Sequence, residues 1–173
     1  MFDAMNTSSA KVQSLWRIAA IDAVLLVVAC GVPALSHLLA WPLYWLNPML
    51  LVLLAGMLLV GDRRNAYLLA VLLPVVSMLA VGMPTPTKAL CMVAEYSTVV
   101  FVSGRLQAWN GQFAGTFGAM LLAMLGGKAV YYLLKAVLLA PVVLVSTPVW
   151  MQLAVVVVAA AIYATLMKLK IKK

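Results

Sequence analysis

Residues 48–65 read PMLLVLLAGMLLVGDRRN and decide the fold, because an unbroken apolar run stops at Val60 and a charged turn with two arginines follows. The rest of the chain repeats this alternation of long apolar runs and short polar breaks. Nine of the twelve Lys and Arg residues fall before the first run, in alternate breaks or after the last run: Lys11, Arg17, Arg63, Arg64, Arg105, Lys168, Lys170, Lys172 and Lys173. An excess of cationic side chains marks the cytoplasmic side of a membrane protein, so both chain ends are predicted to lie there.

The composition favours a membrane protein over a soluble one. Of the 173 residues, 66% are hydrophobic and only 9% are charged, whereas a soluble domain is about half apolar and about a quarter charged. One hydrophobic core cannot hide so much apolar surface from water, but lipid can solvate it. We therefore expect a multi-pass protein of the bacterial cell (inner or plasma) membrane.

The expected fold is all-α, a single domain over residues 1–173 that forms a six-transmembrane-helix bundle with cytoplasmic N- and C-termini. The second span is short, since a full crossing needs about twenty residues, and it is expected to be partly buried among the other helices. Residues 61–65 are expected to form a cytoplasmic turn, and residues 82–87, rich in Pro, an outer loop that is not helical. The predicted spans cover about 15–40, 48–60, 66–81, 88–106, 113–139 and 149–167.

The formal net charge of +8 raises the question of nucleic-acid binding, since basic clusters attract phosphate. The basic residues lie at the span ends, however, and no basic groove with interleaved aromatic side chains is present. Membrane topology and contact with anionic lipid explain these charges better. Membrane lipid is therefore an expected partner, and nucleic acid is not.

Catalytic and metal-binding motifs are scarce. One His and four acidic residues provide neither a metal triad nor a Ser-His-Asp constellation. Ser36 and His37 are adjacent, and neighbours on a helix diverge by about 100°, so they do not form a nucleophile and its base. Cys30 and Cys91 fall inside apolar runs without metal-ligand spacing, and a Gly-rich phosphate loop is absent. We expect no catalytic residue, no metal and no cofactor, and any pumping would draw its energy from a partner.

Four ionisable residues are expected to lie inside the hydrocarbon layer: Asp22, His37, Glu95 and Lys128. Such groups are costly in hydrocarbon and are functional candidates by default. Three of them, His37, Glu95 and Lys128, fall in the outer half of the expected bundle. Asp22 falls in the inner half, where Arg17 or Arg105 is its expected partner.

Other polar and aromatic residues are expected near the outer ionisable group, and together they predict a substrate-binding pocket open to the exterior. Small-ligand sites have apolar walls with a few convergent polar groups. Glu95 and Lys128 would orient a zwitterionic or hydrogen-bonding solute there. The expected substrate-binding residues are His37, Trp41, Trp45, Asn47, Ser77, Lys88, Glu95, Tyr96, Lys128 and Tyr131, with Tyr132 nearby.

Structural explanations stay open for several of these residues. Glu95 and Lys128 pair only with each other in one such explanation, since buried ions usually find partners. In the structural explanation of His37, this residue caps a helix end or faces the membrane interface. In that of Asn47, the residue before Pro48 is a helix N-cap. The tyrosines belong to an interfacial aromatic belt.

Three stretches of the sequence resemble a known family of membrane proteins. Residues 54–63 read LAGMLLVGDR, residues 73–77 read LPVVS, and residues 82–84 read GMP. Together with six expected spans and an aromatic, proline-containing first outer loop, they resemble the substrate-binding S components of energy-coupling-factor (ECF) transporters. The layout matches over the whole chain, but the motifs match only about residues 54–86.

The resemblance implies a function and partners. A small water-soluble vitamin or related micronutrient is captured from outside and passed through a transmembrane coupling subunit that works with two ATPase subunits. The site is expected in the outer half, with the first, third and fifth outer loops contributing. The coupling motif of the first span would fall on Ala19 and Ala23, although Asp22 between them is unusual for that motif.

Two other function classes remain. The first is a structural or assembly membrane protein similar to the rod-shape protein family, which predicts a filled interior with Glu95 and Lys128 paired. The second is a small intramembrane enzyme, which the poor acid-base inventory disfavours.

Overall fold

The computed structural model describes residues 2–40, 43–106, 113–138 and 148–171, and within these ranges all regular structure is helical. The elements are α1 (Phe2–Leu38), the short 3₁₀ helix η1 (Leu43–Leu46), α2 (Pro48–Val60), α3 (Arg63–Val81), α4 (Pro86–Leu106), α5 (Phe113–Leu138) and α6 (Val149–Ile171). The all-α prediction is thus confirmed for the described part of the chain.

Five of the helices are long and apolar enough to cross a membrane: α1, α3, α4, α5 and α6. The remaining one, α2, has 13 residues and at a rise of about 1.5 Å per residue spans only about 20 Å. The fold is therefore compatible with a multi-pass membrane protein.

Helix α2 begins and ends where the sequence analysis expects, for identifiable reasons. Pro48 at its first turn needs no backbone donor. Gly61 adopts the left-handed conformation (φ 74°) that an L side chain disfavours, and its N–H donates to the Met57 carbonyl. Leu53 is fully buried on one face of α2, so the helix packs among its neighbours, as its short length suggests.

Three helices begin earlier than predicted, since α1 extends back to Phe2 and both α3 and α4 start a few residues before their expected spans. The carboxylate of Asp62 accepts a hydrogen bond from the Arg64 N–H at 3.1 Å, so this N-cap starts α3 at Arg63. The predicted turn over 61–65 is therefore wrong beyond Asp62, and Asn65 is a buried helical residue. Likewise α4 starts at Pro86 inside the predicted non-helical loop, because proline is well suited to the first turn of a helix.

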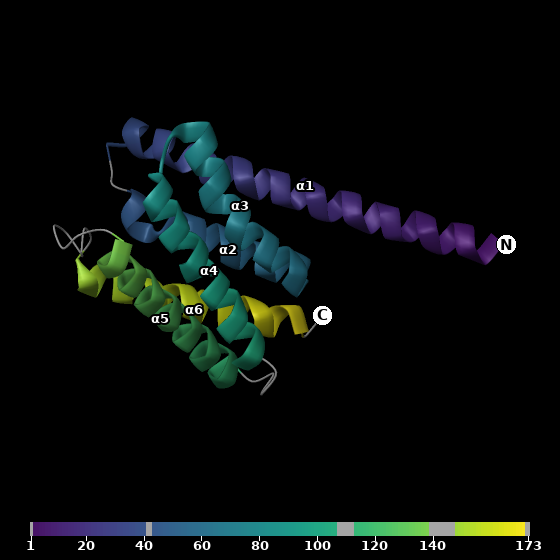
Figure 1. The fold of residues 1–173 in the computed structure, drawn as a ribbon. Helices are drawn as coiled ribbons and strands as arrows, with labels where there is room; N and C mark the ends of the chain where they lie inside the picture. The colour runs from purple at the N-terminus through teal and green to yellow at the C-terminus, as the bar shows by residue number, and fades with distance from the viewer. Residues whose placement is uncertain (1, 41–42, 107–112, 139–147, 172–173) are drawn as a thin grey trace.

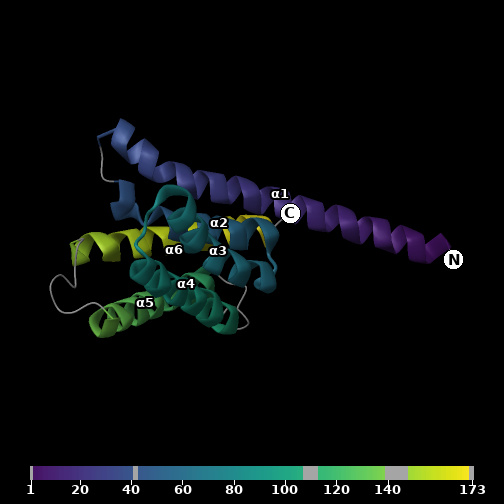
Figure 2. The ribbon, with the colours of Figure 1, turned by 45° about the horizontal axis from the view of Figure 1, so that its top comes forward.

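The helices after α1 run up and down beside one another, and α4 lies against both α3 and α5 (Figure 1). Helix α1 packs on α2 and α3, and its N-terminal part projects beyond the other helices in both ribbon views (Figure 2). We call the end with η1, the α3–α4 turn and the last turn of α5 the η1 end. The opposite end, with the α2–α3 turn and the last turn of α6, is the lysine end.

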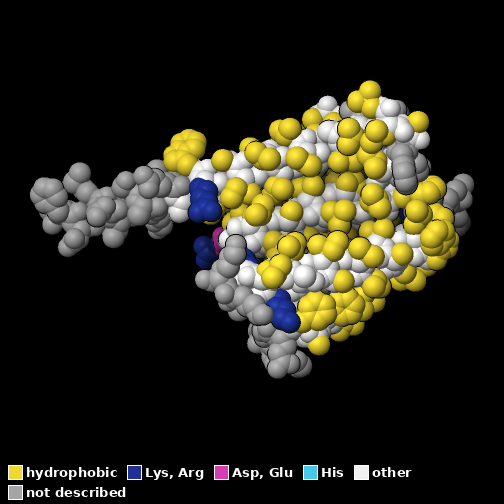
Figure 3. Space-filling model, turned by 180° about the vertical axis from the view of Figure 1, so that it is seen from behind, with side chains coloured by type: hydrophobic (Ala, Val, Ile, Leu, Met, Phe, Trp, Pro, Cys, Tyr) yellow, Lys and Arg dark blue, Asp and Glu magenta, His cyan; other side chains and the backbone are white. Residues whose placement is uncertain are grey.

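The apolar side chains both fill the interior and cover the outside. Leu69, Leu73 and Met120 are fully buried, whereas Leu79 and Val137 are 76% and 75% exposed. Figure 3 shows apolar side chains over the middle of one face, and Lys and Arg side chains mainly at the lysine end. A surface of this kind is stable against lipid and costly in water.

Candidate functional site

The central feature of the site is an ion pair between α4 and α5. Lys128 Nζ lies 2.8 Å from Glu95 Oε1, and the side chains are 20% and 2% exposed respectively. Gly127 makes this approach possible, since a Cβ there would lie 2.9 Å from the Glu95 backbone oxygen and 2.8 Å from Val99 Cγ2. The small residue at 127 therefore brings the carboxylate of α4 within reach of the lysine of α5.

The pair is held by charge rather than by a well-directed hydrogen bond. Within the described residues, Glu95 Oε1 has no hydrogen-bond partner although Lys128 Nζ is close to it. The ammonium thus lies off the direction in which a good hydrogen bond would form. Two buried ions recover their lost hydration fully only when further hydrogen bonds satisfy them, and the Asn47 side chain supplies one to the Glu95 carboxylate.

The ion pair belongs to a column of residues along the α4–α5 seam. The helices are antiparallel, and Lys88 and Glu95 on α4 lie two turns apart, as do Lys128 and Lys135 on α5. Lys88 and Lys135 are close enough to act on each other electrostatically. Between these two levels, Tyr131 places its ring 5.5 Å from Lys128 Nζ. The seam is therefore polar from the ion pair to the η1 end.

Asn47 joins the site because its side chain does not cap α2. The residue occupies the N-cap position in the left-handed conformation (φ 48°, ψ 59°), and its side chain makes no capping hydrogen bond. Its backbone carbonyl accepts from the N–H groups of Leu50 and Leu51. The side chain instead accepts a hydrogen bond at Oδ1 from the Tyr96 hydroxyl, at 3.1 Å.

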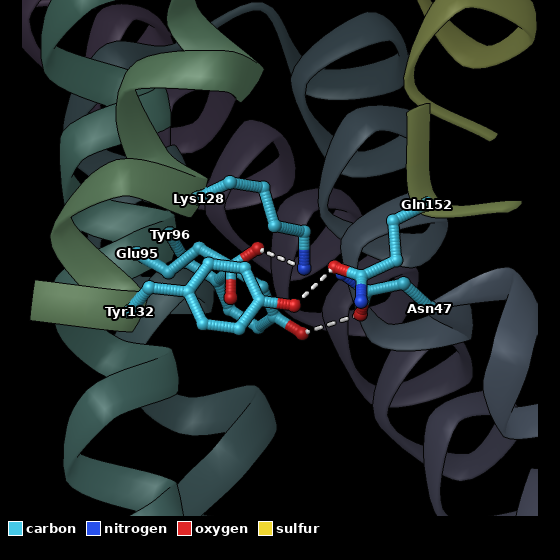
Figure 4. A network of polar contacts seen from close by, with 6 residues as sticks. All are labelled: Asn47, Glu95, Tyr96, Lys128, Tyr132 and Gln152. Carbon is cyan, nitrogen blue, oxygen red and sulfur yellow. Dashed lines mark hydrogen bonds and ion pairs between the residues drawn. The ribbon is translucent and has the colours of Figure 1, made fainter. Parts of the chain in front are cut away.

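The side-chain amide of Gln152 on α6 also accepts a hydrogen bond from a tyrosine hydroxyl. The Tyr132 hydroxyl donates to Gln152 Oε1 at 2.6 Å, and Tyr132 packs edge-on against Tyr131. Figure 4 shows the side chains of Lys128, Asn47 and Gln152 converging from three different elements. In each amide the oxygen faces a tyrosine, so the NH₂ group, a pure donor, points away from that tyrosine.

A small hollow lies beside the ammonium. Its lining consists of Trp45, Asn47, Leu50, Lys128, Gln152, Val155 and Val156. The cavity volume is about 20 Å³, enough for a water-sized group, which needs about 10–15 Å³. Trp45 reaches the hollow from η1, which is tied to α1 because the Leu43 N–H donates to Ser36 Oγ at 3.2 Å.

Most of the predicted substrate-binding residues that the structure describes lie in or beside this network. Glu95, Tyr96, Lys128 and Tyr131 come together at the seam, and Trp45 and Asn47 lie on the hollow side. The side chain of His37 and the whole of Trp41 lie outside the described residues.

Ser77 and Lys88 occupy other places. Ser77 is fully buried and donates to the Met83 carbonyl at 2.8 Å, so it closes the α3–α4 turn. Lys88 is exposed two turns from Glu95 and does not line the hollow. Neither side chain contacts the ion pair within the described structure.

Sequence reasoning missed Gln152. It is the one polar side chain near the start of a strongly apolar helix, and that isolation was a usable signal. The same kind of signal singled out Glu95 and Lys128, but Gln152 carries no charge.

The predicted partner of Asp22 is wrong. Asn65 Nδ2 donates to Asp22 Oδ1 at 3.0 Å, joining α3 to α1. Arg105 lies elsewhere, 5.3 Å above the Phe101 ring. Asp22 is 7% exposed, and the helical position of Asn65 puts an amide against it where an arginine was expected.

The described residues contain no cluster of three or more His, Cys, Asp or Glu side chains that could hold a metal ion. The polar groups of the site are the Lys128 ammonium, the Glu95 carboxylate, two amides and two tyrosine hydroxyls. Comparison with protein-family models, with curated proteins and with solved structures finds no match for this chain.

Proposed function

We propose that this chain is the membrane-embedded, substrate-binding subunit of an importer, similar to an ECF S component. It captures a small water-soluble micronutrient, such as a vitamin, from outside. In this proposal all six helices form the membrane domain, the lysine end and both termini face the cytoplasm, and the η1 end faces the exterior. A transmembrane coupling subunit with two ATPase subunits then drives release inward.

The observation that carries the proposal is the convergence of polar side chains from α4, α5 and α6, and of Asn47 just before α2, beside a hollow at the η1 end. Polar groups are costly in a membrane interior unless they serve a site or a bond. The hollow is small, so a solute larger than a few atoms has to replace one of the tyrosine–amide contacts to enter. Those contacts are single hydrogen bonds, each worth only about 1 kcal/mol net.

The coupling part of the proposal is supported by the position of Ala19 and Ala23. Both are exposed on α1, whereas Ala160 and Ala164 on α6, with the same spacing, are buried inside the bundle. Small residues four apart allow close helix packing. The pair on α1 is thus unused within the described bundle and is open to a partner helix.

Native mass spectrometry of the gently purified full chain tests the proposal. We expect a co-purifying small molecule in the parent protein and its loss in Glu95→Gln and in Lys128→Met. Lys168→Met is the matched control, because Lys168 is an exposed lysine at the opposite end of the bundle. A solute retained in both site variants would show that the ion pair is not the binding site.

A second function is favoured by a specific observation, the filled interior. Leu50, Leu53 and Met124 are almost fully buried, and the ion pair is closed at 2.8 Å. A structural or assembly protein of the rod-shape type would use Glu95 and Lys128 only to join α4 to α5. It predicts that no solute co-purifies and that the double variant Glu95→Leu with Lys128→Leu keeps the protein's cellular role.

A further inference from the structure

The lysine end carries arginines on two neighbouring helices. Arg63 and Arg64 begin α3, and Arg105 lies in the last turn of α4. All three side chains are exposed, and the two helices pack side by side. The exposed acid beside them is Asp62, whose carboxylate already accepts a hydrogen bond from the Arg64 N–H. This part of the described surface therefore has an excess of positive charge, which attracts anions.

Arg63 reaches across from α3 to α4. Its guanidinium lies against Gly104, and a Cβ at position 104 would overlap that guanidinium. The absence of a side chain at Gly104 thus gives Arg63 its place on α4, one residue before Arg105. A cation that is held in place loses less side-chain entropy when it binds an anion than one that moves freely.

The arginines lie at the edge of the apolar surface. The Arg105 guanidinium carbon lies 5.3 Å from the centre of the Phe101 ring, and Phe101 is 51% exposed. On α3, Leu68 is 53% exposed and follows Arg64 by four residues, so both lie on the same helix face. Figure 3 shows Lys and Arg side chains that border the apolar face at this end. Each helix thus presents a cation with an exposed apolar side chain one turn nearer its middle.

This combination favours a lipid over a soluble anion. A soluble phosphate, or an acidic protein surface, would leave Leu68 and Phe101 uncovered. A phospholipid joins a phosphate to hydrocarbon in one molecule and so matches both parts of the surface. Guanidinium groups suit phosphate oxygens because their N–H donors form a planar fork, and a guanidinium stacked on a ring still presents N–H groups at its edge.

We propose that the lysine-end parts of α3 and α4 bind an anionic phospholipid of the phosphatidylglycerol type. Its phosphate contacts Arg63 and Arg105, and an acyl chain lies over Phe101 and Leu68. Arg64 adds positive charge beside the phosphate. This surface lies at the opposite end of the bundle from the hollow, so the proposal does not depend on whether the chain binds a solute.

Native mass spectrometry tests the proposal on the full chain, released from nanodiscs of equal parts phosphatidylglycerol and phosphatidylcholine with the same acyl chains. Choline already supplies a cation for its own phosphate. We therefore expect phosphatidylglycerol to be retained about tenfold more, since each basic residue near anionic lipid contributes about 1 kcal/mol. Arg63→Gln and Arg105→Gln should each lower this ratio severalfold. Lys88→Gln, which removes an exposed lysine at the η1 end, should leave it unchanged.

Gly104→Ala is the sharpest variant, because it keeps every charge. The new Cβ takes the place of the Arg63 guanidinium, whose flexible side chain has to turn away from α4. We expect the retention ratio to fall about as far as in Arg63→Gln. Gly118→Ala on α5 is the matched control, since a Cβ there meets nothing within 4 Å, and it should keep the ratio of the parent.

A second charge-preserving variant guards against misfolding of Gly104→Ala. Arg63→Lys keeps the charge on an exposed side chain but loses the planar fork of donors. It should also lower the retention ratio, and an unchanged ratio would contradict a phosphate contact at Arg63.

Three outcomes overturn the proposal. The first is equal retention of the two lipids by the parent chain. The second is the parent's ratio in a folded Gly104→Ala variant, because the arginines would then attract the lipid by charge alone. The third is displacement of the lipid by glycerol phosphate, which carries the anion without acyl chains. That result would assign the surface to a soluble phosphate ester.

Discussion

The two ends of the bundle each bury one acid, but they satisfy it differently. At the lysine end Asp22 accepts a hydrogen bond from the neutral amide of Asn65. At the η1 end Glu95 faces the cation Lys128. The first contact only joins two helices, whereas the second places a charge beside a hollow. A buried acid is a candidate for function when its partner, as Lys128 does here, can also contact a bound molecule.

The cations at the two ends also differ. At the lysine end Lys170 Nζ donates to the Leu58 carbonyl at 2.7 Å, at the C-terminus of α2, and Arg105 lies over Phe101. Both are exposed side chains that serve local structure. Lys128, by contrast, points into the bundle (Figure 4). The distinction predicts a graded series of mutational effects.

The largest effect on stability is expected for Lys128→Met. Removal of the ammonium leaves the Glu95 carboxylate buried without a counter-charge, which costs about 3 kcal/mol or more. Unfolding by denaturant in mixed micelles measures the change. Adding Glu95→Gln to Lys128→Met should restore most of the loss, and an unchanged stability of the single variant would show that the pair contributes little.

Gly127→Ala should have the next largest effect. The new Cβ would lie 2.8 Å from Val99 Cγ2 and 2.9 Å from the Glu95 carbonyl oxygen, so α4 and α5 must separate at a cost of about 2 kcal/mol. Gly126→Ala is the matched control, because a Cβ at Gly126 meets nothing within 4 Å. The same unfolding measurement should show Gly126→Ala equal to the parent or more stable.

Asn65→Ala tests the lysine end. It leaves Asp22 Oδ1 buried without its donor and should cost about 1 kcal/mol in the free energy of unfolding. Solute binding should stay unchanged, since the contact is remote from the hollow. A clear loss of binding in Asn65→Ala would contradict the division of the bundle into a structural end and a binding end.

The smallest effect is expected for Lys170→Met. Its ammonium satisfies one carbonyl at the end of α2, and an exposed contact of this kind is worth about 0.5 kcal/mol. Lys168→Met, two residues away on the same helix, should have no measurable effect. Equal stability losses in the two variants would indicate a general effect of charge and not a specific cap.

The sequence predicts the helical class and most helix boundaries because both follow from local chemistry. Unbroken apolar runs need helical hydrogen bonding in lipid, and Gly61 and Gly82 end α2 and α3 in left-handed conformations. Helix α1 extends further toward the N-terminus and α6 further toward the C-terminus than the predicted spans, whereas the starts of α3 and α4 differ at residues that serve both loops and helix starts. Asp62 and Pro86 are of this kind, and whether they extend or cap a helix depends on the backbone that follows them.

The candidate site was less predictable, since its contacts depend on how the helices are rotated. Depth along the helices put Glu95 and Lys128 in the same half of the bundle, and their pairing was one of the interpretations left open. It was not enough to place Ser77, which turns toward its own loop, or to find Gln152. The sequence also could not decide what the Asn47 side chain does. An Asn before a Pro is equally compatible with a helix cap and with a contact in the site.

The shortness of α2 affects how water reaches the site. If α2 ends level with its neighbours at the lysine end, its 13 residues leave about 10 Å of a 30 Å hydrocarbon layer uncovered at the other end. In that arrangement Asn47 would lie at the floor of a recess below the lipid headgroups, with η1 packed beside it against α1 and α6. A polar solute would shed its hydration shell in stages along this recess, before it meets the dry helix seam.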